Sequence, residues 1–206
     1  VTDNYAVNLA DFNNDGFPEV YVGNEIFDAI TGTRLAAGGA NNIGNNIYDF
    51  YMHEHFHANP VAVDALPDGD CTNCNGLELV AGNQVYSVDL GTGVMAVERE
   101  LTSAPGYQDG PVSIADYDLD GDVDGIITTT DEDGSYLYVW DLQTETMIGN
   151  AHTIANADIS TIWYRSASNA TIADFDGDNK PEIGVCANYV FQVIEDYQFD
   201  ISGTGG

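Results

Sequence analysis

The sequence predicts an all-β fold made of four similar units. Three observations support this prediction. An acidic segment between two apolar runs occurs four times in the 206 residues, at intervals of roughly 50 to 60 residues. In three of the four units, a later apolar run ends in the pattern D-x-x-T. Helix signals are nearly absent. Each unit is too small to bury its own apolar faces, so the units must stack, as the four-stranded blades of a β-propeller do.

The acidic segments align with one another residue by residue. The first runs from Val7 to Gly23 (VNLADFNNDGFPEVYVG), the third from Ser113 to Ile127 (SIADYDLDGDVDGII) and the fourth from Thr171 to Val185 (TIADFDGDNKPEIGV). The second, from Val61 to Gly82, is looser and contains an insertion with two cysteines. Apolar residues flank every acidic segment, so each is expected to be a loop between two strands.

A hairpin turn is predicted at each D-x-x-T pattern, because apolar residues alternate before it and a polar break follows. The turns begin at Asp28, Asp89 and Asp141, and the fourth unit lacks this pattern at Ile194–Tyr197. Each unit is therefore expected to contain a strand, an acidic loop, two strands, a turn and a strand. The repeats are approximately 5–36, 60–98, 111–149 and 169–198, all within one propeller segment that spans residues 1–206.

The acidic loops are predicted to bind Ca²⁺, which prefers six to eight oxygen ligands. Acids or amides fall at loop positions 1, 3, 5 and 9, and closely spaced carboxylates repel one another unless a cation neutralises them. The backbone carbonyls of Phe17, Val123 and Lys180 are expected as further ligands. The side-chain ligands are Asp11, Asn13, Asp15 and Glu19 in the first loop, Asp116, Asp118, Asp120 and Asp124 in the third, and Asp174, Asp176, Asp178 and Glu182 in the fourth.

The second loop fits this pattern less well. Leu66 occupies position 3, so Asp64, Asp68, Asp70 and Glu78 would have to close around the insertion to hold an ion.

The acidic loops have two alternative interpretations. An EF-hand shares the opening D-x-D-x-D-G but needs Glu at position 12 and flanking helices. Position 12 is Val22, Ile127 or Val185 here, and the flanks are strands. The other alternative is a set of solvated Asp-Gly turns in a salt-adapted protein, which does not explain why three loops agree at four positions.

The net charge of −30, from 34 acidic and 4 basic residues, excludes several classes of partner. Nucleic acids and anionic membranes repel so negative a surface, whereas divalent cations are attracted to it. The sequence has no apolar stretch of 18 residues, so no membrane insertion is expected.

Other residues leave open alternatives. Cys71 and Cys74 form either a local disulfide, which would fit an extracellular setting, or two free thiols. Cys186 lies in an apolar run and is expected to be buried. The alternating His53, His55 and His57 either bind a transition metal or belong to an exposed loop. Trp163, Tyr164 and Arg165 either stack on a sugar or pack in the core.

The four acidic segments resemble the FG-GAP/VCBS repeat family, whose calcium loops decorate the propellers of integrin α-subunits and many secreted bacterial proteins. Propellers of this family usually have seven or eight blades, and their ligands bind on the face opposite the calcium loops. The resemblance implies that the remaining blades come from a longer chain or from neighbouring subunits. The absence of a leader before Val1 and the glycine-rich end also suggest a piece of a longer chain.

The expected function is a calcium-stabilised extracellular propeller, secreted or at the cell surface, that mediates adhesion or binds a protein or glycan. One alternative is a polysaccharide lyase or other glycan-active enzyme, since some lyases use this repeat. The chain contains no familiar catalytic motif and few basic residues for an acidic glycan, which favours the non-enzymatic interpretation. The other alternative is a structural module of a large surface adhesin or filament.

Overall fold

The computed structural model describes residues 6–39, 59–104, 110–130, 135–154, 167–187 and 190–194. Within these ranges every regular element is a β-strand, so the predicted all-β class is confirmed. The same ranges contain no helix that is long and apolar enough to cross a membrane.

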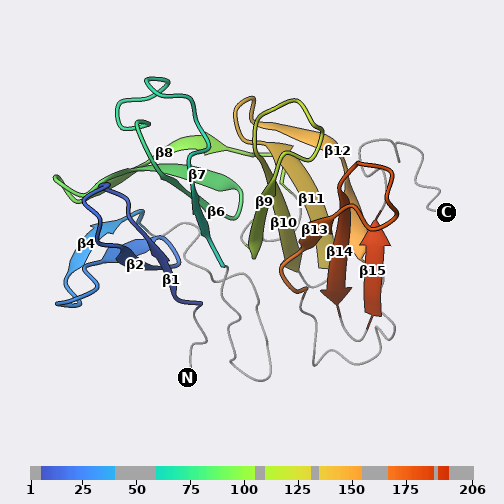
Figure 1. The fold of residues 1–206 in the computed structure, drawn as a ribbon, viewed down its shortest axis with the longest axis horizontal. Helices are drawn as coiled ribbons and strands as arrows, with labels where there is room; N and C mark the ends of the chain where they lie inside the picture. Colours follow the sequence, from blue (N-terminus) through green and yellow to red (C-terminus); the bar gives the residue numbers. More distant parts are fainter. Residues whose placement is uncertain are drawn as a thin grey trace.

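The strands form four antiparallel groups that follow one another along the chain (Figure 1). The first group contains β1 (Asn8–Ala10), β2 (Glu19–Val22), β3 (Glu25–Phe27) and β4 (Arg34–Ala37). The second contains β5 (Val61–Val63), β6 (Glu78–Ala81), β7 (Gln84–Asp89) and β8 (Val94–Glu100). The third contains β9 (Val112–Ala115), β10 (Asp124–Thr130), β11 (Ser135–Asp141) and β12 (Thr146–Ile154). The fourth contains β13 (Thr171–Ala173), β14 (Glu182–Ala187) and β15 (Val190–Ile194).

The first and second groups are joined into one eight-stranded sheet, with the order β1-β2-β3-β4-β8-β7-β6-β5. The junction is a single parallel pair, Ala37 with Val94, between the last strands of the two groups. The sequence predicted two separate sheets at this place. The two groups nevertheless face each other across a shared core, because Tyr21 and Ile26 of the first group pack with Leu79 and Tyr86 of the second.

Three hydrophobic cores fill the spaces between successive groups. The second core joins β6 and β7 to β10 and β11, and the third joins β10 and β11 to β14 and β15. Side chains alternate across each strand, so neighbouring residues serve different cores. In β11, Tyr138 and Trp140 pack toward the second group, whereas Leu137 and Val139 pack toward the fourth. The middle strands of the two inner groups, β6, β7, β10 and β11, therefore bury both of their faces, as their continuous apolar runs predict.

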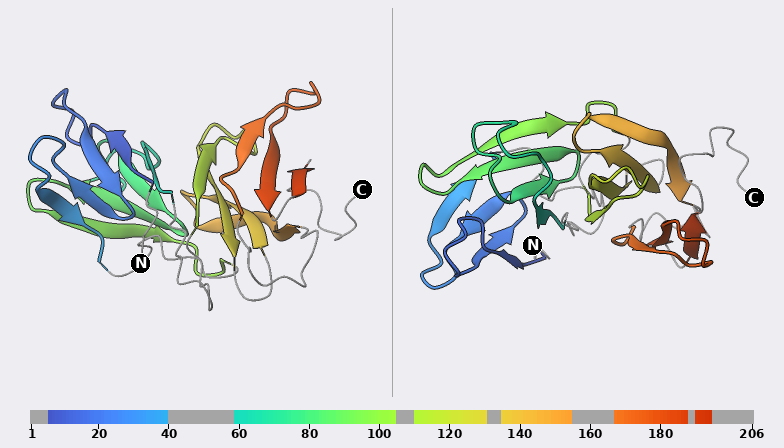
Figure 2. Two further views of the ribbon diagram at one scale, coloured as in Figure 1. Left: turned by 90° about the horizontal axis from the view of Figure 1, so that it is seen from below. Right: turned by 45° about the horizontal axis from the view of Figure 1, so that its top comes forward.

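Hydrogen bonds also link the groups through their first strands or the segments just before them. Asn8 Nδ2 donates to Asn59 Oδ1 at 2.7 Å, and the Val112 N–H donates to the Asn59 carbonyl at 3.0 Å. Ser113 Oγ donates to the Ala170 carbonyl at 2.8 Å. Figure 2 shows the groups arranged side by side in chain order.

The antiparallel topology places all four acidic loops at corresponding ends of their groups. Each acidic loop connects the first and second strands, and each D-x-x-T turn connects the third and fourth, so loop and turn lie at the same end. The three predicted turns at the D-x-x-T patterns are present. In each, the aspartate carboxylate accepts a hydrogen bond from the backbone N–H of the threonine (Asp28 with Thr31, Asp89 with Thr92, and Asp141 with Thr144).

Candidate metal-binding loops

One hydrogen bond is repeated in all four acidic loops. The acid that begins the second strand of each group accepts a bond from the backbone N–H of the residue after the first aspartate. The donor–acceptor pairs are Phe12–Glu19 at 2.9 Å, Ala65–Glu78 at 2.9 Å, Tyr117–Asp124 at 2.7 Å and Phe175–Glu182 at 2.5 Å. All four acids are buried, and we call them the latch acids. Each latch acid therefore ties the start of its loop to the end.

The first aspartate of the first, third and fourth loops closes the turn from the other side. Its carboxylate accepts from the backbone N–H at position 6, which belongs to Gly16 (2.8 Å), Gly121 (3.2 Å) or Asn179 (3.0 Å). These three residues have φ angles of 90°, 105° and 70°, in the left-handed region. Glycine reaches this region without strain, and asparagine tolerates it better than most residues do. The loop geometry thus explains the sequence at position 6.

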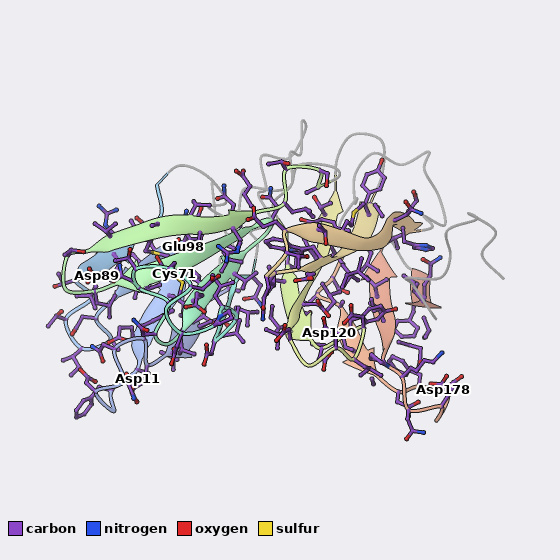
Figure 3. All side chains as sticks on the ribbon, turned by 90° about the horizontal axis from the view of Figure 1, so that it is seen from above. Asp11, Cys71, Asp89, Glu98, Asp120 and Asp178 are labelled. Atoms are coloured by element: carbon purple, nitrogen blue, oxygen red, sulfur yellow. A yellow bond between two sulfur atoms is a disulfide. The ribbon has the colours of Figure 1, made fainter. Side chains whose placement is uncertain are left out.

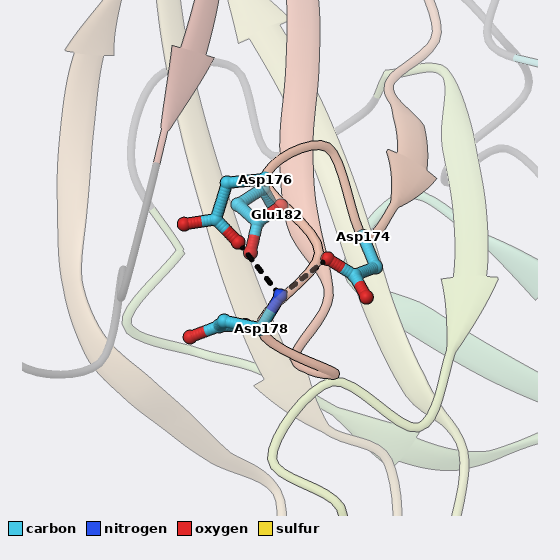
Figure 4. Close-up of side chains that lie close together, drawn as sticks. All are labelled: Asp174, Asp176, Asp178 and Glu182. Carbon is cyan, nitrogen blue, oxygen red and sulfur yellow. Dashed lines mark hydrogen bonds between the residues drawn. The ribbon is translucent and has the colours of Figure 1, made fainter.

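Four carboxylates converge in the fourth loop (Figure 4). Asp174, Asp176, Asp178 and Glu182 each offer one oxygen, and these oxygens lie within 4.8 Å of one another. The three aspartates are exposed, whereas Glu182 is buried. The Asp178 N–H donates to both Asp174 and Asp176, which holds their carboxylates on one side of the loop. Such a cluster of oxygens is suited to a hard divalent cation.

Three carboxylates converge in the third loop, from Asp116, Asp118 and Asp120. The Oδ1 atom of Asp116 is buried and has no hydrogen-bond partner. Burial raises the pKa of Asp118, and the negative charges of Asp120, Asp116 and Asp141 raise it further. Burial also raises the pKa of the latch acid Asp124 to about 7, with smaller contributions from Asp118 and Asp120. Among the residues that the structure describes, no ion pair involves these carboxylates, so the loop concentrates negative charge that a bound cation would neutralise.

The first loop has the same hydrogen bonds but a looser set of oxygens. Asp11, Asp15 and Glu19, all of which the structure describes, do not bring three carboxylate oxygens within the same 4.8 Å. Asn13 replaces the aspartate at position 3, and its amide nitrogen lies 3.4 Å from Glu19 Oε1. Its amide oxygen accepts from the Asp15 N–H at 3.0 Å. An ion in this loop would use the Asn13 oxygen in place of a carboxylate.

The second loop is built differently. The side chain of Leu66, at position 3, is buried in the core between the second and third groups. Asp70 forms an ion pair with Arg99, and Asp64 and Asp68 are exposed. Glu78 keeps the latch position, and burial raises its pKa. The four acids predicted for this loop do not converge on one point.

The carbonyl ligands were predicted at Phe17, Val123 and Lys180. The N–H groups of Phe17 and Lys180 each donate to the aspartate at position 5, at 2.8 Å in both loops. In the third loop the same bond comes from Asp122, at 3.0 Å. The backbone carbonyl of Asp122 is therefore the one equivalent to the carbonyls of Phe17 and Lys180. Val123 follows Asp122 in the chain, and its side chain packs against the second core.

The structure decides between the two alternatives for Cys71 and Cys74 and corrects the expectation for Cys186. Cys71 and Cys74 form a disulfide, with their Cα atoms 5.2 Å apart. Cys186 is exposed, contrary to the expectation of burial. It alternates with the buried Val185 on β14, and its cross-strand neighbour Phe191 is itself 59% exposed. The outer face of the fourth group is apolar but uncovered.

The remaining candidate sites lie outside the described residues. These are the histidine set, His53, His55 and His57, and the aromatic set, Trp163, Tyr164 and Arg165.

Comparison with protein-family models, curated proteins and solved structures found no match to this chain.

Proposed function

We propose that this protein is a calcium-stabilised β-propeller segment that acts as an extracellular binding or scaffolding module. The observation that carries the proposal is the convergence of four carboxylates in the fourth loop, within 4.8 Å of one another. Oxygen-only ligands on a short, glycine-containing loop fit Ca²⁺ better than a transition metal, which prefers nitrogen or sulfur. The third loop brings three carboxylates together, from Asp116, Asp118 and Asp120, and the first offers a looser set with Asn13.

The propeller part of the proposal is supported by the packing of the groups. The middle strands of the two inner groups bury both faces against neighbouring groups, which is how blades pack around an axis. The outer groups leave apolar side chains uncovered, among them Leu9 on the first and Phe191 on the fourth, at 63% and 59% exposure. We propose that further sheets cover these faces, supplied by the rest of a longer chain or by neighbouring subunits.

The extracellular setting is supported by two features. Disulfides persist in oxidising compartments, and Cys71 and Cys74 form one. Calcium sites with exposed ligands bind weakly and are filled where calcium is abundant, as it is outside cells.

The pairing of the basic side chains with acids favours a binding or scaffolding role over a lyase. Catalysis on an acidic glycan needs basic groups that are free to meet it. In the part of the chain that the structure describes, Arg34 pairs with Glu25, Arg99 with Asp70 and Lys180 with Asp178. A glycan or protein pull-down would separate a binding module from a purely structural module of an adhesin or filament.

Calcium binding is tested by titration calorimetry and thermal unfolding of the purified chain. We expect at least three Ca²⁺ ions per chain, and a higher melting temperature in calcium than in chelator, because a ligand that binds only the native state stabilises it. Equal melting temperatures in the two solutions would contradict the proposal. Mg²⁺ at the same concentration is the control, since it demands octahedral geometry and keeps its water.

A further inference from the structure

The second acidic loop closes without the converging carboxylates of the third and fourth loops. Its third position is Leu66, which is 1% exposed and packs in the core between the second and third groups. A carboxylate at this point would be buried in an apolar environment. Asp70, the acid at its seventh position, forms an ion pair with Arg99 and so needs no metal ion to neutralise it.

The disulfide lies where this loop meets the core. Cys74 is 0% exposed and belongs to the same cluster as Leu66, Val112 and Trp140, and Cys71 packs against that cluster. Figure 3 shows Cys71 within the second group, apart from the labelled acids of the other three loops. The Gly69 N–H donates to the Cys74 carbonyl at 3.3 Å, so the backbone also closes around the disulfide.

The latch acid completes the closure. Glu78 Oε2 accepts from the N–H groups of both Ala65 and Leu66, at 2.9 and 3.1 Å. The segment from residue 65 to residue 78 is thus fixed at its ends by the latch acid and in its middle by the disulfide. Its apolar contacts reach the third group, because Val112 and Trp140 belong to β9 and β11.

We propose that the Cys71–Cys74 disulfide takes the place of the metal ion in the second loop, and that it makes the contact between the second and third groups sensitive to reduction. Reduction by a dithiol transfers two electrons and two protons to the disulfide. The S–S bond breaks, two thiols form, and the dithiol is oxidised to its own disulfide. The two sulfur atoms then separate to van der Waals contact, and because Cys74 is fully buried, the loop has to move to make room.

The test combines reduction with hydrogen exchange and calcium titration, all on the whole chain. Exchange of the amides of residues 65–74 is measured in the oxidised and reduced protein, in calcium and again in chelator. We expect exchange to rise about tenfold or more on reduction in both solutions, while exchange in residues 171–187 stays constant. The melting temperature should fall by roughly 4 to 8 °C, as expected for loss of a small disulfide loop in a chain of this size.

Calcium stoichiometry separates this inference from the proposed function. It should be the same before and after reduction, and Asp68→Asn should not change it. The double variant Cys71→Ala/Cys74→Ala gives the same comparison if the native disulfide resists the reductant. Cys186→Ser, which removes an exposed thiol, is the matched control and should change neither exchange nor stability.

Two results would overturn the inference. One is unchanged exchange of residues 65–74 after mass spectrometry has shown that the disulfide is reduced. The other is the loss of one bound ion on reduction or in Asp68→Asn, which would make the second loop a metal site. If the chain bound no calcium at all, the proposed function would be contradicted. The inference about the disulfide would then be judged from the hydrogen-exchange rates of residues 65–74 alone.

Discussion

The backbone N–H of Tyr117 donates a hydrogen bond of 2.7 Å to the buried carboxylate of Asp124, from the second residue of the third acidic loop to the first residue of β10. The equivalent bond is present in the other three loops, including the second, where the other acids do not converge. The latch acid therefore closes the loop by hydrogen bonding, whether or not the remaining acids are placed to hold an ion. Closure of the loop and binding of the ion are separable, and substitutions can test each.

The first prediction concerns the latch acid itself. Asp124→Asn keeps an oxygen that can accept the Tyr117 N–H but removes the charge, whereas Asp124→Ala removes both. In chelator, Asp124→Asn should be at least as stable as the natural protein, because burial disfavours the charged form. Asp124→Ala should lose about 1 to 3 kcal/mol, because it leaves a buried N–H without a partner. Urea unfolding measures both, and equal stability of the two variants would contradict the latch.

The second prediction concerns the converging carboxylates. Asp176→Ala should remove one ion from the fourth loop, and Asp118→Ala one from the third. In calcium, each should lose the stabilisation that a bound ion gives, about 2.7 kcal/mol at a calcium concentration 100 times the Kd. In chelator, each variant should lose little stability, because the substitution relieves repulsion between neighbouring acids.

The matched control for these variants is Asp68→Ala, an exposed aspartate at the fifth position of the second loop. It should change neither calcium stoichiometry nor the difference in stability between calcium and chelator. If Asp68→Ala and Asp176→Ala behaved alike in calorimetry, the assignment of the ligands would be wrong.

The third prediction concerns pH and the D-x-x-T turn at Asp89. Hydrogen bonds from the Thr92 hydroxyl and N–H, and from the Gly91 N–H, lower the pKa of Asp89 below its ordinary value, and burial opposes them only in part. Because the folded-state pKa is depressed, the turn contributes stability above the ordinary pKa of aspartate and loses it as the pH falls through the folded value. Thr92→Val should raise the pKa of Asp89, measured by NMR titration, and leave that of Asp28 in the first turn unchanged. An unchanged pKa of Asp89 in Thr92→Val would show that the Thr92 hydroxyl does not lower this pKa.

The fourth prediction concerns Arg99, which bridges two groups. Its guanidinium pairs with Asp70 of the second loop, and its Nε atom donates to the Gln143 carbonyl of the third group at 3.3 Å. The Arg99 side chain is only 17% exposed, and Glu145 of the third group lies 3.9 Å away. Arg99→Ala should lower the free energy of unfolding by about 1 kcal/mol, because it removes a largely buried side chain and its hydrogen bond to the third group, whereas Asp70, which is 43% exposed, would be solvated. Arg34→Ala, which breaks a surface pair that is 60% and 40% exposed, should change stability by less than about 0.5 kcal/mol.

Local patterns in the sequence predicted most of the strands and the shape of the loops. Apolar runs located β2, β6, β10 and β14 after the acidic segments, and the D-x-x-T pattern located the three turns, because strands and turns are specified by neighbouring residues. The sequence also explained the left-handed residue at position 6. The double role of the latch acids was missed, although their alignment with one another in four loops was the signal that could have found it.

Features that depend on distant residues could not be read from local patterns. The pairing of Ala37 with Val94 joins strands more than fifty residues apart, and nothing near either residue indicates the partner. In the sequence, nothing distinguishes Arg99 from the other three basic residues. Its role as a bridge between two groups depends on how the second and third groups pack together. Cys186 was expected to be buried because its neighbours are apolar, but apolar runs predict burial of both faces only where a further sheet covers the second face.

The last prediction follows from the uncovered apolar faces at the two outer groups. Phe191 and Val193 are 59% and 40% exposed on β15, whereas the equivalent faces of the inner groups are buried against a neighbour. Apolar surface of this kind favours association, and three bound Ca²⁺ ions would reduce the net charge that opposes it from −30 to about −24. We therefore expect the isolated 206 residues to self-associate in calcium at high salt, which screens the remaining charge, as measured by light scattering over a range of concentrations. Phe191→Ser should reduce this association. Ile30→Ser, which removes an even more exposed side chain from a turn, should not, because Ile30 belongs to no sheet face. A monodisperse monomer that melts sharply would show that the four groups need no further sheets.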